Sequence, residues 1–182
     1  MSNNNVQITP HFNLREFECK CGCGAVGIKS GLPEKLEKVY QYLAATKDSV
    51  TAIYITSGYR CPRHSCAVGG TADDAHTRGL AADFYAVKGD GKTRWSSNEL
   101  AAVCELIGFT GIGIIDNTAV HADIRTSENY KNSHWFGDER TGNDNISSFM
   151  DYLPRSGEKP ITTTKHKIAV YIDGEKVFES EV

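Results

Sequence analysis

Two histidines and one aspartate in this chain have the types and the spacing of metal ligands. His76 and Asp83 lie seven residues apart in AHTRGLAAD (75–83), and His121 follows in VHADIR (120–125). A catalytic zinc ion takes three protein ligands, commonly histidine nitrogens and a carboxylate oxygen, and leaves a fourth position for water. Each of these residues is also common without a metal, as a half-buried packing residue or a loop cap. The spacing alone therefore leaves the zinc site as one of two interpretations.

A second group of metal-ligand types is the cysteine-rich stretch CKCGCG (19–24), which holds Cys19, Cys21 and Cys23. Three thiols within five residues can bind a structural metal, especially if Cys61 or Cys66 folds back onto them. The spacing differs from the common C-x2-C of zinc ribbons, so reduced thiols with only a packing role are the alternative. A disulfide framework is the weaker interpretation without a secretion signal. The sixth cysteine, Cys104, lies in a helical pattern and is expected to be a small buried residue.

The elements that must position these groups follow from periodicity and capping residues. Helices are predicted over 32–47 and 96–109, with shorter helical segments at 13–18, 62–67 and 145–153. Strands are predicted over 50–57, 80–87, 111–115 and 119–125. This order of helices and strands favours an α+β fold, with a small, mainly antiparallel sheet and flanking helices.

The last of these strands has one polar and one apolar face. His121 and Asp123 share a face because strand side chains alternate with a period of two, and the apolar residues between them face the other way. Such a strand is typical of the boundary between a core and a cleft. Asp123 can also pair with Arg125, which would be a structural use of the same carboxylate.

Composition excludes several classes of protein. The chain has 182 residues, 40% of them hydrophobic, and a formal net charge of −3, so a packed domain is expected and a basic nucleic-acid surface is not. No apolar run approaches the ~20 residues needed to span a bilayer. The polar start MSNNNVQITPHFN lacks the apolar segment of a secretory signal, so we expect synthesis in a cytoplasm and either retention there or another route of export.

Several motifs together resemble the M15 family of zinc peptidases. In order along the chain these are SGYRCPRHSCAVGG (57–70), HTRGLAAD (76–83) and VHADIR (120–125), and the entry FNLREFECKCGCG also looks like one branch of the family. The resemblance covers about residues 11–136. It implies a fold like that of hedgehog proteins and D-Ala-D-Ala peptidases, with His76, Asp83 and His121 as zinc ligands.

The resemblance also suggests substrate-binding residues. Arg60 matches an arginine that family members use to hold carboxylate or carbonyl groups, and the planar guanidinium suits this task. Ser57 and Tyr59 stand beside it and are expected to line the cleft. The alternative for Arg60 is a structural ion pair with a nearby acid. Asp74 replaces the usual family serine, where it can hydrogen-bond a ligand or change substrate preference.

The general base is the weak point of the resemblance. Several branches of the family place a catalytic acid three residues before the third ligand, where this chain has Thr118. We rank Asp123 first as a replacement, then Asp116 in the preceding turn, then His134 in the following loop. A salt bridge or an orienting role is the alternative for Asp123, and a surface position is the alternative for His134.

By this resemblance the chain is a zinc-dependent hydrolase of amide bonds in peptidoglycan stem peptides or cross-links, of the carboxypeptidase, murein endopeptidase or phage endolysin type. Peptidoglycan peptides are the expected partner, with no nucleic acid or membrane, and a monomer is expected. One alternative keeps the fold and the zinc but only binds peptidoglycan or forms part of a phage particle. Another makes the cysteine cluster the principal metal site of an interaction protein.

The domain organisation predicted is a peptidase domain over 1–153, a linker over 154–165 and a β-hairpin over 166–182. The hairpin is indicated by alternating residues around the turn pair Asp173-Gly174. Two strands alone are marginally stable, so we expect them to extend the sheet, with a small wall-contacting module as the alternative. A murein enzyme without a leader is expected to reach the bacterial wall as phage lysins do, through a membrane lesion.

Overall fold

The computed structural model describes residues 4–130, 132–154, 167–172 and 175–181. Two longer helices and one short helix are present: α1 (Leu32–Ala44), α2 (Pro62–Ala67) and α3 (Ser97–Ile107). Short 3-10 turns occur at η1 (Leu14–Phe17) and η2 (Met150–Tyr152). The strands are β1 (Ala52–Ser57), β2 (Ala81–Val87), β3 (Gly111–Ile114), β4 (Ala119–Asp123), β5 (Trp135–Asp138), β6 (Lys167–Ile172) and β7 (Glu175–Glu181).

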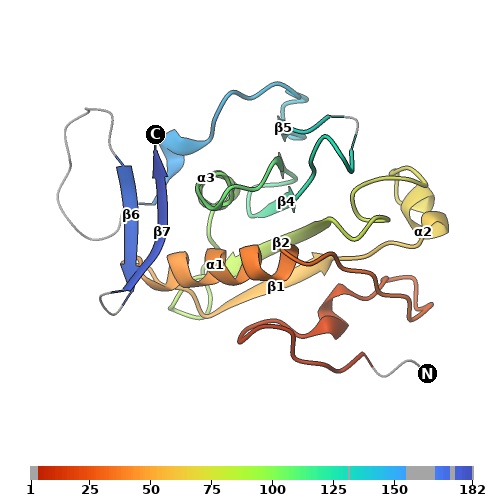
Figure 1. The fold of residues 1–182 in the computed structure, drawn as a ribbon, viewed down its shortest axis with the longest axis horizontal. Helices are drawn as coiled ribbons and strands as arrows, with labels where there is room; N and C mark the ends of the chain where they lie inside the picture. Colours follow the sequence, from red (N-terminus) through yellow and green to blue (C-terminus); the bar gives the residue numbers. More distant parts are fainter. Residues whose placement is uncertain (1–3, 131, 155–166, 173–174, 182) are drawn as a thin grey trace.

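Five strands form one sheet in the order β1-β2-β4-β3-β5. Neighbours pair antiparallel except β3 and β5, which run parallel. Figure 1 shows α1 and α3 beside this sheet, while α2 lies beyond the C-terminal end of β1. The predicted α+β class with a small, mainly antiparallel sheet is confirmed, and the parallel pair makes the sheet mixed.

One face of the sheet carries the hydrophobic core. Phe84 of β2, Val120 of β4 and Ile112 of β3 are almost completely buried, in one cluster with apolar residues of α1 and α3. Because side chains alternate along each strand, Asp83 and His121 project from the opposite face. The core therefore holds the strands that present the predicted metal ligands.

The helix ends follow the local sequence. Ser96 caps α3 by accepting the Glu99 N–H, and the Glu99 carboxylate bonds back to the Ser96 N–H, which is a capping box. Gly108 ends the helix in a left-handed conformation with φ of 85°. The helix predicted over 32–47 ends three residues earlier than expected, at Ala44.

Two segments differ from the sequence-based expectation. Strand β5 lies where the sequence predicted no strand, because its four residues include Gly137 and form too short a pattern to indicate one. It forms because its backbone pairs with β3, a contact between segments distant in sequence. The helix predicted over 145–153 is reduced to the single turn η2.

The C-terminal strands β6 and β7 pair with each other as an antiparallel hairpin. They form a separate two-stranded sheet, so the expectation that they extend the main sheet is wrong for the described strands. The predicted turn pair 173–174 and most of the predicted linker, 155–165, lie outside the described residues. None of the helices in the described part of the chain has the length and apolar character of a membrane span.

Candidate metal centre

Strand register brings two of the three predicted ligands together. Asp83 of β2 is the direct partner of His121 of β4 in the antiparallel ladder. His76 reaches the same point from the loop that follows α2. The turn after it contains Gly79, whose φ of 70° suits glycine and where a Cβ would lie 2.5 Å from the Gly27 carbonyl oxygen.

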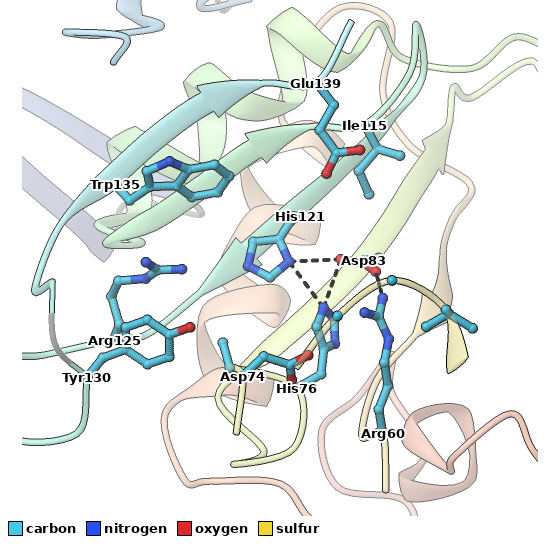
Figure 2. Close-up of a pocket in the computed structure, with 14 residues that line it drawn as sticks. Arg60, Asp74, His76, Asp83, Ile115, His121, Arg125, Tyr130, Trp135 and Glu139 are labelled. Carbon is cyan, nitrogen blue, oxygen red and sulfur yellow. Dashed lines mark hydrogen bonds and ion pairs between the residues drawn. The ribbon is translucent and has the colours of Figure 1, made fainter. Parts of the chain in front are cut away.

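Three donor atoms of these residues form a compact triangle (Figure 2). His121 Nδ1 lies 2.9 Å from Asp83 Oδ1 and 3.2 Å from His76 Nε2, and His76 Nε2 lies 3.1 Å from Asp83 Oδ1. Tetrahedral zinc with ligands at ~2.0–2.1 Å would separate its donors by about 3.3 Å. The three residues therefore fit a zinc ion, and their two nitrogens and one oxygen are a donor set typical of catalytic zinc.

Each histidine is oriented through its other ring nitrogen. His76 Nδ1 donates a hydrogen bond to the Gly58 carbonyl oxygen at 2.8 Å. Its Nε2 therefore faces Asp83 and is free to bind a metal ion. His121 Nε2 donates to Asp123 Oδ2 at 3.0 Å, which leaves Nδ1 facing the centre. Such contacts fix ring orientation and tautomer in metal sites.

Asp123 is in turn held by Arg125. It is completely buried, and its two carboxylate oxygens lie 2.8 and 2.9 Å from Arg125 Nε, with a further bond from the same guanidinium. The Arg125 backbone N–H also donates to Oδ1 at 3.0 Å. The sequence offered a salt bridge or an orienting role as the alternatives to a catalytic role for Asp123. The carboxylate makes both contacts, an ion pair with Arg125 and a hydrogen bond from His121.

These contacts shift the ionisation of the site. Burial alone raises the pKa of Asp83, but hydrogen bonds from His121 and His76 outweigh it and hold the pKa well below its usual range. Burial alone lowers the pKa of His121, but the bonds to Asp123 and Asp83 raise it to about 9. Without a metal ion, both ring nitrogens of His121 therefore carry a proton at neutral pH. A bound metal ion would replace the proton on Nδ1, the nitrogen that faces the centre.

Arg60 pairs with the ligand carboxylate. Its Nη2 bonds to Asp83 Oδ2, while Asp83 Oδ1 faces the histidines, and its Nε donates to Ser57 Oγ at 2.7 Å. Within the described part of the chain, Arg60 Nη1 has no hydrogen-bond partner, and Arg60 lines the pocket over the site. Ser57 and Tyr59 are not among the lining residues, and the Tyr59 ring packs on Gly27 instead.

Asp74 lines the pocket but bonds away from the ligands. Its carboxylate accepts from the Ser65 hydroxyl and from the Thr77 backbone N–H at 2.9 Å. The direct hydrogen bond to a metal ligand that the sequence allowed is therefore not made. Asp74 instead stabilises the turn that carries His76.

The site opens into a pocket of about 460 Å³. Trp135 forms one wall, with its ring centroid 6.2 Å from that of His121 in an edge-on arrangement. Glycines on the cleft face of two strands make room for this ring: a Cβ on Gly113 would lie 2.8 Å from Trp135 Cη2, and one on Gly137 would lie 2.5 Å from Cζ2. The indole therefore lies flat across positions where any other side chain would collide.

Gly113→Ala is expected to destabilise the protein by about 1–3 kcal/mol, because the added methyl group overpacks against Trp135. In an unconstrained strand interior the same change would stabilise by about 0.5–1 kcal/mol, so the sign of the effect tests the contact. Urea unfolding of the variant measures it. Trp135→Ala should remove most of the penalty in the double variant, and an unfolding midpoint unchanged by Gly113→Ala alone would contradict the prediction.

The structure does not bring the three predicted base candidates to the pocket. Asp123, Asp116 and His134 are all absent from its lining residues. Asp116 Oδ1 accepts the backbone N–H groups of Thr118 and Ala119, both at 2.7 Å, and so caps its own turn. His134 is exposed with its ring against Phe136, at a centroid distance of 4.2 Å.

One acidic residue that the sequence analysis missed does line the pocket. Glu139 follows β5, and its backbone N–H bonds to the Ile114 carbonyl oxygen at 2.9 Å. Figure 2 shows its carboxylate directed into the pocket on the side of His121 and Asp83. The period-two spacing of Trp135, Gly137 and Glu139 was the available signal, but it has meaning only once β5 is known to be a strand.

A mixed sheet carries on its open face a His-Asp-His triangle that could hold a metal ion, with a pocket above it. The chain belongs to the peptidase M15 family, whose model, described as Peptidase M15, matches residues 10–123. The match includes all three donor residues and ends before Trp135 and Glu139. No curated protein matches the chain, and no solved structure does.

Proposed function

We propose that this protein is a zinc-dependent peptidase that hydrolyses amide bonds in the stem peptides or cross-links of peptidoglycan. The observation that carries the proposal is the triangle of donor atoms on His76, Asp83 and His121, with separations of 2.9–3.2 Å at the base of an open pocket. Membership of the M15 family supports the peptidase activity. The peptidoglycan substrate rests on the motif resemblance.

In the proposed hydrolysis, different residues of the chain transfer the proton and orient the metal ligands. Zinc, when bound, supplies a Lewis acid and lowers the pKa of a bound water to about 7. Of the acidic residues that line the pocket, Asp83 belongs to the triangle and Asp74 bonds to the turn of His76. Glu139, whose carboxylate is directed into the pocket, therefore accepts the proton from the attacking water and returns it to the leaving amine. Asp123, held by Arg125, keeps the His121 ring turned with Nδ1 toward the centre.

Substrate positioning falls to groups around the triangle. Arg60 keeps Nη1 for a substrate carbonyl or carboxylate while its other nitrogens hold Asp83 and Ser57. Trp135 offers a flat apolar wall on the opposite side. On this proposal Asp116 and His134 have structural roles, and Asp123 positions a ligand.

Zinc-loaded protein incubated with purified peptidoglycan tests the proposal. Mass spectrometry of the soluble fragments should show new amine termini or lost D-alanine, and the fragment masses would identify the bond. His121→Ala should abolish release, while His64→Ala on α2, outside the triangle, should not.

Absence of cleavage across several wall chemistries, with zinc bound, would overturn the proposal. Retained binding to peptidoglycan in that case would favour the alternative of a non-catalytic wall-binding or phage structural protein. Thr118, at the position where several branches have their acid, is the feature that favours this alternative.

A further inference from the structure

A second constellation of metal-ligand types lies outside the pocket. Cys19, Cys21 and Cys23 come from one tight loop, and Cys61 comes from the start of α2, forty residues later. Their four sulfur atoms all lie within 4.8 Å of one another. Cys66 does not join them, although the sequence offered it as an equal candidate. The fold therefore brings one distant cysteine, Cys61, next to the three cysteines of the loop.

The sulfur separations match a shared metal ion. Cys19 Sγ lies 3.4 Å from Cys21 Sγ, and Cys21 Sγ lies 3.8 Å from Cys61 Sγ. Tetrahedral zinc with Zn–S bonds of ~2.3 Å separates its sulfurs by about 3.8 Å. A disulfide needs about 2.05 Å, and the described cysteines are all free thiols.

The backbone around the cluster is arranged to support sulfur ligands. The Cys61 N–H points at Cys19 Sγ over 3.3 Å, and such a donor stabilises a thiolate. Gly22, between Cys21 and Cys23, and Gly24, directly after Cys23, have φ of 80° and 70°, a conformation that suits glycine and lets the chain curl around the cysteines. Cys19 is buried while Cys21 and Cys23 are exposed, which leaves an entry path for an ion.

We propose that Cys19, Cys21, Cys23 and Cys61 bind a structural zinc ion, separate from the His-Asp-His centre. Four thiols lose their protons to solvent on binding, and the four protein ligands leave no open position. Such a closed tetrahedral site is structural rather than catalytic. The proposal does not depend on the peptidase activity.

The ion would link the N-terminal segment to the loop that carries Arg60, a residue that lines the pocket. Cys61 directly follows Arg60, and the Tyr59 N–H bonds to the Phe17 carbonyl oxygen at 2.9 Å. Gly58, whose carbonyl orients His76, packs so closely that a Cβ there would lie 2.5 Å from Phe17 Cα. The cysteine site therefore lies beside the backbone that sets the positions of Arg60 and His76.

Metal content of the full chain, purified under reducing conditions and loaded with zinc, tests the site. The wild type should hold two zinc ions per chain, and His76→Ala/His121→Ala should keep one. Cys21→Ser/Cys61→Ser should also keep one, while Cys66→Ser, an exposed cysteine of α2, should keep two. Loading the His76→Ala/His121→Ala variant with cobalt(II) should give the intense thiolate-to-metal charge-transfer absorption of sulfur ligands.

Several outcomes would overturn the inference. Loss of all zinc in His76→Ala/His121→Ala, with its circular dichroism still that of the wild type, would show that the cysteines hold none. Bound iron in place of zinc would show that the cysteines hold another metal, and a cobalt spectrum without thiolate absorption would show that they are not the ligands. A cluster found oxidised to disulfides in freshly purified protein would assign the cysteines to a covalent link instead. Because these are measurements of metal, they stand even if no peptidase activity is found.

Discussion

Glu139→Gln should lower kcat for peptide hydrolysis roughly 10²–10⁴-fold while zinc content and thermal stability stay at wild-type values. The amide keeps the size of the side chain but cannot take up a proton from water. Glu139 is exposed, lines the pocket, and its described hydrogen bond is made by the backbone, so its side chain contributes little to the fold. Steady-state kinetics with a fragment identified from peptidoglycan digestion measure the effect.

Glu128→Gln is the matched control for this prediction. Glu128 is also exposed and lies in the loop before β5, but it is not among the residues that line the metal pocket. The control should retain wild-type kcat. A Glu139→Gln enzyme with undiminished kcat would remove Glu139 from the mechanism and return the role of base to another group.

Asp123→Ala should cost about 3–5 kcal/mol of unfolding free energy in the metal-free protein, because Arg125 is left as a buried charge without its partner. Zinc affinity should fall about 10–100-fold, because His121 loses the carboxylate that orients its ring. Urea unfolding measures the first effect, and competition with a zinc chelator measures the second.

Removing both members of the buried pair separates the two effects. Asp123→Ala/Arg125→Met should recover part of the lost stability, since no charge is then stranded, while zinc affinity stays low. If Asp123→Ala instead lowered kcat more than 10²-fold with zinc affinity and stability intact, Asp123 would be the base, as the sequence ranking had it.

The two predicted roles of Asp123 show where sequence reasoning reached its limit. Period-two alternation placed it on the face of His121, which is correct, and that placement alone favoured a base beside the metal. The structure shows that it lies on the far side of the imidazole, at Nε2, whereas the triangle is formed by Nδ1. Which ring nitrogen faces which carboxylate depends on the rotamer of His121, and no spacing rule reports it.

Local chemistry in the sequence by itself determined much of this protein. The capping box of α3, the helical turn after Asn13 and the short helix after Cys61 follow from residues within a few positions of one another. The strands β2 and β4 were predicted from their residue patterns, and the polar face of β4 follows from alternation. The ordered motifs around His76, Asp83 and His121 were enough to indicate an M15 peptidase, which the family match confirms.

Tertiary structure alone decided the features that join distant segments. Strand β5 exists because β3 offers it a backbone partner, and only with β5 in place do Trp135 and Glu139 line the metal pocket. The choice of Cys61 over Cys66 as the fourth member of the cysteine cluster is of the same kind. In each case the deciding contact spans many residues of chain, and its energy comes from packing and pairing that local propensity does not contain.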